Sequence, residues 1–149
     1  MHDSNLEKIS KFIKQHHLLT LATSQNNIPY VNSAFYAFND DNMTFIIASD
    51  DKTQHIKNVS HNSNVAVSIA LETKEVGKIQ GIQINAIMSE SYTLKGHQDY
   101  DSNAKLYFKE FPYAKIMNPK LWILKIEWMK FTDNRLGFGN KIEINFKES

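Results

Sequence analysis

The sequence has no cysteine, so disulfide bonds, thiolate catalysis and cysteine-ligated metal sites are excluded. Six histidines are present, but none follows a zinc-ligand spacing such as HExxH, and no metal site is expected. Neither sign of charge dominates, because 17 basic residues accompany 16 acidic ones. The chain therefore lacks the excess of basic residues that binding to nucleic acid or to an anionic membrane requires.

Long apolar runs are also missing. No stretch approaches the length of a membrane span, and the first residues lack the basic and apolar regions of a signal peptide. We therefore expect a cytoplasmic protein. Arginine is nearly absent, since Arg135 is the only one beside sixteen lysines. A site that needs a positive charge is expected to use lysine or histidine.

What the sequence does contain is typical of an ordinary globular protein, with 42% apolar and 22% charged residues. A length of 149 residues suits a single domain, here residues 1–149, with a substantial buried core.

Most of the predicted elements are strands joined by short turns rich in Asn and Asp. Helices are expected over residues 5–16, 52–60 and 97–111. Strands are expected over residues 18–23, 28–38, 43–49, 65–71, 78–89 and 121–131, followed by a strand pair around Gly137 and Gly139. Strands linked by hairpins favour an antiparallel sheet that closes or folds over to remove its edges. The predicted fold is mainly β, a small barrel of six or seven strands with peripheral helices.

Alternation along two strands predicts which side chains share a face. In the strand over 121–131 the even positions, from Trp122 to Trp128, are expected to point one way. In the strand over 78–89, Gln83 falls on the polar face. It either faces solvent or lines a pocket where it can hydrogen-bond a ligand, and both alternatives stay open.

One polar segment lies where a strand is expected to end and a helix to begin. Helix N-termini present unpaired N–H groups and a positive dipole end, which suits a phosphate. Hydroxyl donors and candidate positive charges follow one another there: Ser49, Lys52, Thr53, His55 and Lys57. A solvated helix cap formed by Asp50 or Asp51 accounts for the same pattern. Physical chemistry alone favours that simpler interpretation.

The order of residues in this segment resembles the phosphate anchor of the pyridoxamine-phosphate-oxidase-like, FMN-binding split barrels. The pattern is a strand, Ser49, three residues, Thr53-Gln54-His55, and then Asn58-Val59 and Asn62. The resemblance implies that Ser49 and Thr53 hold the phosphate of FMN, with Lys52 supplying positive charge. His55 stands where the family usually has Lys, and Gln54 where some members have Arg.

The resemblance extends over nearly the whole chain. Residues 19–32 are similar to the family's opening hairpin, and the next four match the strand whose backbone borders the isoalloxazine ring: Ser33, Ala34, Phe35 and Tyr36. Gly81-Ile82-Gln83, Leu121-Trp122 and Leu136-Gly137-Phe138-Gly139 followed by Lys141 resemble the uncharacterised bacterial YhbP-like branch. By this resemblance Gln83 is a candidate to bond the flavin carbonyls.

The resemblance implies an antiparallel split β-barrel and a homodimer with two FMN sites at the subunit interface. It also implies a flavin-dependent oxidoreductase that acts on a small molecule by hydride or electron transfer. No catalytic side chain is assigned, because in flavoproteins the ring carries the chemistry. The alternative is a non-catalytic module that holds FMN, haem or another planar ligand for sensing, storage or delivery.

Two C-terminal features have simpler interpretations than ligand binding. Gly137-Phe138-Gly139 lacks the preceding strand and following helix of a dinucleotide loop, so a tight turn or bulge in a late hairpin is favoured. Arg135 can hold a flavin or substrate anion, but a local pair with Asp133 is favoured.

Overall fold

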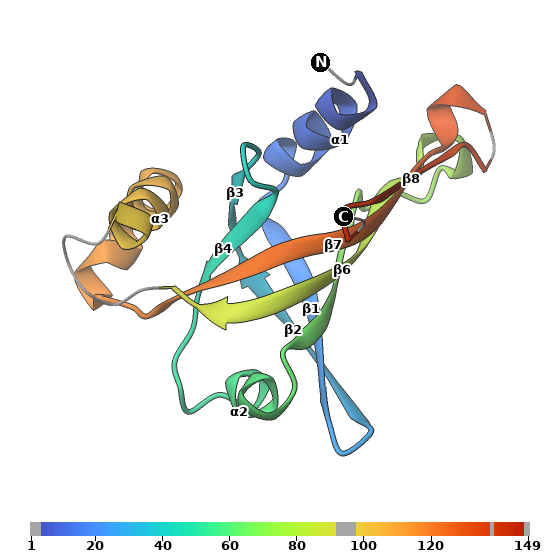
Figure 1. The fold of residues 1–149 in the computed structure, drawn as a ribbon. Helices are drawn as coiled ribbons and strands as arrows, with labels where there is room; N and C mark the ends of the chain where they lie inside the picture. Colours follow the sequence, from blue (N-terminus) through green and yellow to red (C-terminus); the bar gives the residue numbers. More distant parts are fainter. Residues whose placement is uncertain (1–3, 92–97, 138, 148–149) are drawn as a thin grey trace.

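A computed structural model describes residues 4–91, 98–137 and 139–147 (Figure 1). The strands within this part are β1 (Leu18–Gln25), β2 (Ile28–Phe35), β3 (Ala37–Asn39), β4 (Thr44–Ala48), β5 (Asn64–Ala70), β6 (Gln80–Glu90), β7 (Leu121–Asp133) and β8 (Lys141–Asn145). The helices are α1 (Ser4–Gln15), α2 (Gln54–His61) and α3 (Gln98–Glu110), with short 3-10 turns η1 (Val76–Lys78), η2 (Pro112–Met117) and η3 (Asn134–Leu136). No helix in these residues is long and apolar enough to cross a membrane.

The strands form one antiparallel sheet in the order β2-β1-β5-β6-β7-β4-β3, with β8 paired to β7. Only Tyr36 separates β2 from β3, so the two edges of the sheet are consecutive stretches of one chain. The sheet therefore curls back on itself into a split barrel, as the sequence predicts. Figure 1 shows α1 and α2 at opposite ends of the curled sheet.

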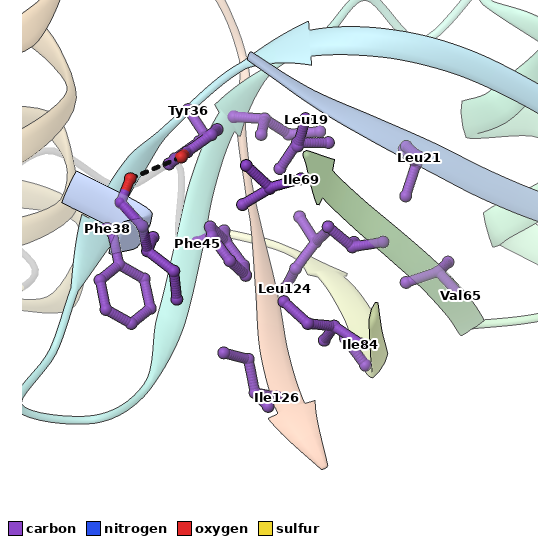
Figure 2. Packing of buried hydrophobic residues seen from close by; sticks show 14 of the residues in the cluster. Leu19, Leu21, Tyr36, Phe38, Phe45, Val65, Ile69, Ile84, Leu124 and Ile126 are labelled. Carbon is purple, nitrogen blue, oxygen red and sulfur yellow. Dashed lines mark hydrogen bonds between the residues drawn. The ribbon is translucent and has the colours of Figure 1, made fainter. Parts of the chain in front are cut away.

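The barrel is filled by aliphatic and aromatic side chains from its inner face. Leu19, Phe45, Ile84 and Leu124 come from four different strands and are almost completely buried (Figure 2). Burying a side chain of this size contributes about 1.5–3 kcal/mol each. The helix α1 closes one end of the barrel with three further buried residues: Ile9, Phe12 and Ile13.

The long strand predicted over residues 28–38 is divided at Tyr36, which is buried in the core. Its hydroxyl donates to the carbonyl oxygen of Ile13 at 2.6 Å (Figure 2), and its N–H donates to that of His17 at 3.0 Å. Burial raises the pKa of the phenol well above its usual value. Both bonds tie the bend between β2 and β3 to α1 and the residues just after it.

The strand β7 corrects the prediction for Trp128. Asn85 of β6 pairs with Trp128 and Ala86 pairs with Ile126, so Glu127 is an extra residue that forms a β-bulge. Before the bulge the even positions are buried, and after it the buried positions are odd, Met129 and Phe131. Trp128 therefore leaves the core, and its Nε1 donates to the Glu143 carboxylate on β8 at 2.8 Å.

The C-terminal hairpin agrees with the simpler interpretation of its motif. Gly137 and Gly139 have φ angles of 123° and 73°, a region that L side chains rarely adopt, and they lie between β7 and β8. The guanidinium of Arg135 donates to both carboxylate oxygens of Asp133, at 3.0 and 2.8 Å. That pair lowers the pKa of Asp133 and fixes the arginine beside the turn.

The bond of Tyr36 to α1 predicts a stability effect. Tyr36→Phe is expected to lower the free energy of unfolding by about 0.5–1.5 kcal/mol, because Ile13 keeps a weaker partner in the N–H of His16. Denaturant unfolding measures the change, with Tyr113→Phe, at an 87% exposed position, as the matched control. Equal stability of the two variants would contradict this role.

Candidate functional site

Three of the predicted anchor residues meet at the end of β4. The Oγ of Ser49 lies 2.5 Å from Nε2 of His55, and the Oγ1 of Thr53 lies 3.3 Å from the same nitrogen. The two hydroxyl oxygens are 3.5 Å apart. All three residues are partly buried. We call Ser49, Thr53 and His55 the anchor cluster.

The main chain of Ser49 is fixed by the neighbouring strand β7. Its N–H donates to the carbonyl oxygen of Lys120 at 3.0 Å, which extends the β4–β7 ladder one step beyond Ala48. Its carbonyl oxygen accepts from the indole N–H of Trp122 at 3.2 Å. Both polar groups of the Ser49 backbone are therefore held by β7, and its hydroxyl lies at the start of α2, 3.5 Å from the Oγ1 of Thr53.

The helix α2 is capped by Thr53, which corrects the expectation that Asp50 or Asp51 caps it. The Oγ1 of Thr53 accepts from the N–H of Ile56 at 3.4 Å and donates its proton to the carbonyl oxygen of Asp50 at 2.9 Å. Asp50 instead accepts from the N–H of Lys52 at 2.8 Å, closing the turn before the helix. The observed helix thus begins two residues later than predicted.

The first turn of α2 has free hydrogen-bond donors. Among the residues that the structure describes, the N–H groups of Gln54 and His55 have no acceptor, as expected for the first positions of a helix. They belong to the positive end of the helix dipole. A helix start with free N–H groups is the kind of position that binds a phosphate or carboxylate, and the hydroxyl of Ser49 lies close to it, 3.5 Å from the Oγ1 of Thr53.

Of the residues predicted to supply positive charge, only His55 lies in the anchor cluster. Burial lowers the pKa of His55, which favours the neutral imidazole at pH 7. Lys52 and Lys57 are exposed, and neither ammonium contacts the anchor cluster in the described part of the chain. The cluster is therefore a set of polar donors without a fixed positive charge.

Lys120 is a neighbouring residue that sequence reasoning missed. Its ammonium lies 3.0 Å from the Asp51 carboxylate, 3.2 Å from that of Glu90 and 5.5 Å from the centre of the Trp122 ring. It lines a cavity of about 470 Å³ together with Ser49, and η2 forms the opposite wall. The local sequence around Lys120 does not predict that it lies beside Ser49 and Asp51, because only the pairing of β4 with β7 brings it there.

The position of α2 against the barrel also depends on residues that sequence reasoning missed. The amide nitrogen of Gln54 donates to Asn58 Oδ1 at 2.9 Å, and Asn58 Nδ2 donates to the hydroxyl of Thr23 on β1 at 3.0 Å. Asn58 and Thr23 are both buried. This chain of bonds holds the first turn of α2 at a fixed place relative to the sheet.

The remaining candidates lie on the sheet, away from the anchor cluster. Ser33 and Gln83 are exposed on its outer face, in one row of paired residues: Ser33, Thr20, Ser68, Gln83 and Lys130. Gln83 is seven positions from Glu90, about 23 Å along an extended strand. The structure therefore brings Gln83 together with Ser33 across the sheet, and not with the anchor cluster of the same chain.

The other residues of the predicted ring-bordering strand point to both faces. Ala34 and Tyr36 face the core, and Tyr36 is bonded there to α1. Phe35 is 52% exposed on the outer face, where its ring stacks on His17 at 6.0 Å and contacts Phe111 at 5.4 Å. The ends of β2 and β4 lie against one another, so the backbone of this strand approaches the region of Ser49.

Comparison with known proteins assigns the class of this fold and site. The model of the pyridoxamine 5'-phosphate oxidase family matches residues 6–132. The chain therefore belongs to the pyridoxamine 5'-phosphate oxidase family.

Two relatives narrow this assignment. The chain is 38% identical over 138 residues to a UPF0306 protein of Campylobacter jejuni, covering 92% of this chain and 96% of the relative. It is 31% identical over 137 residues to the UPF0306 protein YhbP of Salmonella arizonae, covering 92% and 90%. The chain belongs to this UPF0306 branch, and its resemblance to the YhbP-like proteins is confirmed.

Solved structures share the fold at low sequence identity. A haem-binding protein from Mycobacterium smegmatis has a TM-score of 0.79 at 13% identity, covering 99% of this chain and 60% of that protein. An FAD-binding protein from Mesorhizobium loti has a TM-score of 0.67 at 18% identity, covering 85% of this chain and 90% of that protein. The TM-scores establish a common fold. At identities this low, they do not establish which ligand this chain binds.

The capping role of Thr53 predicts a second stability effect. Thr53→Ala is expected to lower the free energy of unfolding by about 1 kcal/mol, because Ile56 loses its acceptor at the start of α2. Thr53→Ser keeps the oxygen and is the matched control, with a change within about 0.5 kcal/mol. Denaturant unfolding compares the two variants. The capping role is wrong if the alanine and serine variants have the same free energy of unfolding.

Proposed function

We propose that the protein binds FMN through its phosphate at the anchor cluster and uses the flavin to transfer a hydride or electrons to a small molecule. The observation that carries this proposal is the contact of the Ser49 hydroxyl with the His55 imidazole at the start of α2, a helix whose first two N–H groups have no acceptor among the described residues. Membership of the pyridoxamine 5'-phosphate oxidase family supports it.

The chemistry of the donor set fits a phosphate monoester. Its oxygens accept hydrogen bonds, and the N–H groups of Gln54 and His55 need acceptors. The bonds of Ser49 to Lys120 and Trp122 involve only its backbone N–H and carbonyl oxygen. Its hydroxyl takes no part in them and can turn toward the phosphate. Thr53 already donates its proton to Asp50, so its part is to shape the helix start and to accept.

The outer face of the sheet supports a homodimer. Leu18, Val31 and Phe35 are apolar and 48%, 61% and 52% exposed on the outer face of β1 and β2. A second copy packed on this face covers them. The same contact covers the row that holds Ser33 and Gln83, so these residues reach a flavin at the subunit interface, lined by both chains.

Bound FMN supplies the hydride and electron chemistry, and the residues of this chain bind and orient it. In this proposal the backbone from Ser33 to Tyr36 borders the ring, and Gln83 hydrogen-bonds its carbonyl oxygens from the interface. The cavity between Ser49 and η2 opens beside the anchor cluster and admits a small molecule. Ala114 and Met117 of η2 supply apolar side chains to the lining of this cavity.

Binding of FMN and of riboflavin tests the phosphate assignment. Ser49→Ala is expected to weaken FMN binding roughly 10- to 150-fold, as for loss of one bond to a charged group worth about 1.5–3 kcal/mol, and to leave riboflavin binding unchanged. Flavin fluorescence measures both affinities. Wild-type protein that takes up no FMN contradicts the proposal, and a Soret band in the purified protein would assign haem instead.

Replacing exposed apolar residues of the proposed interface with charged ones tests the dimer. Val31→Asp combined with Phe35→Asp is expected to convert a dimer to a monomer and to weaken FMN binding at least tenfold, because a buried charge without a partner opposes association. Val76→Asp, 59% exposed on η1, is the matched control. Analytical ultracentrifugation measures the oligomeric state of each variant. A wild-type protein that is a monomer would contradict the proposed homodimer.

A further inference from the structure

We infer that His55 couples phosphate binding to the uptake of one proton, so that the anchor cluster holds a phosphate more tightly as the pH falls through neutrality. The inference rests on the proposed function, since it concerns the same cluster. It assigns to His55 the positive charge that the site lacks in the structure, and it makes that charge conditional on the ligand.

The hydrogen bonds of the cluster leave it poorly prepared for an anion while His55 is neutral. The proton of Thr53 is committed to the carbonyl oxygen of Asp50, so Oγ1 can only accept from its neighbours. The contact of 2.5 Å between Ser49 and His55 needs one proton between them. If Nε2 carries none, Ser49 donates its only proton to the ring and neither hydroxyl can donate to a ligand. The other neutral tautomer frees the Ser49 proton but supplies no charge.

One added proton changes both the charge and the direction of these bonds. The Nε2–H of the imidazolium can donate only, so Ser49 becomes an acceptor from the ring and turns its own proton toward the ligand. The ring charge then lies next to the phosphate together with the N–H groups of Gln54 and His55. Bonds between a phosphate and charged donors are about twice as strong as neutral ones.

Within residues 4–91, 98–137 and 139–147, no other cation contacts the anchor cluster. Lys52 precedes the helix and Lys57 lies on it, and both are exposed without a contact to the cluster among the described residues. Lys120 is held by Asp51 and Glu90. The remaining charge near the turn, Asp50, accepts from the N–H of Lys52. From β1 and β2, which pack against α2, the facing groups are the uncharged Thr23 and the phenol of Tyr30.

The sign of the pH dependence follows from this arrangement. Without a ligand, burial lowers the pKa of His55 below its usual 6.5, and a phosphate within hydrogen-bond distance raises it. Between these two pKa values the complex holds one more proton than the free protein, so the association constant falls about tenfold per pH unit as the pH rises. Below the lower pKa and above the higher one, the imidazole contributes no pH dependence.

The experiment measures FMN and riboflavin affinities from pH 5.5 to 8.5 for the wild type, His55→Gln and His55→Lys. The phosphate of FMN titrates near pH 6 and opposes the effect, but it is common to all three proteins and cancels in their ratios. We expect the ratio of wild-type to His55→Gln association constants for FMN to rise by up to tenfold per unit as the pH falls. His55→Lys carries a fixed charge, and its ratio to His55→Gln should stay constant over the range in which lysine is protonated. Riboflavin affinity should follow the same profile in all three.

Two other results would overturn the coupling, and they differ in what they say about the proposed function. If the wild type and His55→Gln bind FMN with parallel pH profiles, the coupling is absent although the proposed function stands. If the wild type binds no FMN at any pH, the proposed function fails and this inference fails with it. Should a variant not fold, the NMR titration of the His55 ring in the wild-type protein decides, because its pKa must rise on addition of FMN. An unchanged pKa overturns the inference.

Discussion

The bend at Tyr36 is the constraint on which the rest of the structure depends. A single residue separates β2 from β3, so one continuous segment supplies both edges of the sheet. Its buried hydroxyl and its N–H are bonded to the carbonyls of Ile13 and His17, which fixes the bend against the end of the barrel that α1 closes. The barrel then curls far enough to bring β2 into contact with β4, the strand that ends directly before Ser49.

The anchor cluster stands on a rigid support. Ser49 is held on both sides of its backbone by β7, and α2 is held to β1 through Gln54, Asn58 and Thr23. Both supports are parts of the barrel, so the distance between Ser49 and His55 is set by the sheet and not by a flexible loop. In our proposal the proton on the imidazole is the part that changes, and a single histidine then supplies the positive charge for an anion.

The relation to known proteins illustrates how little of the function the barrel itself decides. Proteins described as binding haem and FAD share this fold with 13% and 18% sequence identity. One fold can therefore hold different ligands, and the groups around a site select which ligand is bound. In this chain the groups of the anchor cluster are hydroxyls, helix N–H groups and an imidazole, which we propose to bind a phosphate.

The sequence by itself determined the class of fold and the location of the anchor cluster. Alternating strands linked by Asn- and Asp-rich turns specify an antiparallel sheet, and Ser49, Thr53 and His55 lie within seven residues, so a strand end followed by a helix start is enough to bring them together. Local geometry of this kind can be read from the order of residues. The choice of Thr53 over Asp50 as cap was not predictable, because Asp is by preference at least as good an N-cap as Thr.

Only the tertiary structure decided the features that depend on strand pairing. Trp122 and Lys120 reach Ser49 and Asp51 from about seventy residues away, through the register of β4 with β7. The bulge at Glu127 turned Trp128 out of the core, and pairing across four strands placed Ser33 and Gln83 in one row. A shift of one residue in register moves every side chain of a strand to the opposite face, and that register is set by the packing of the whole barrel.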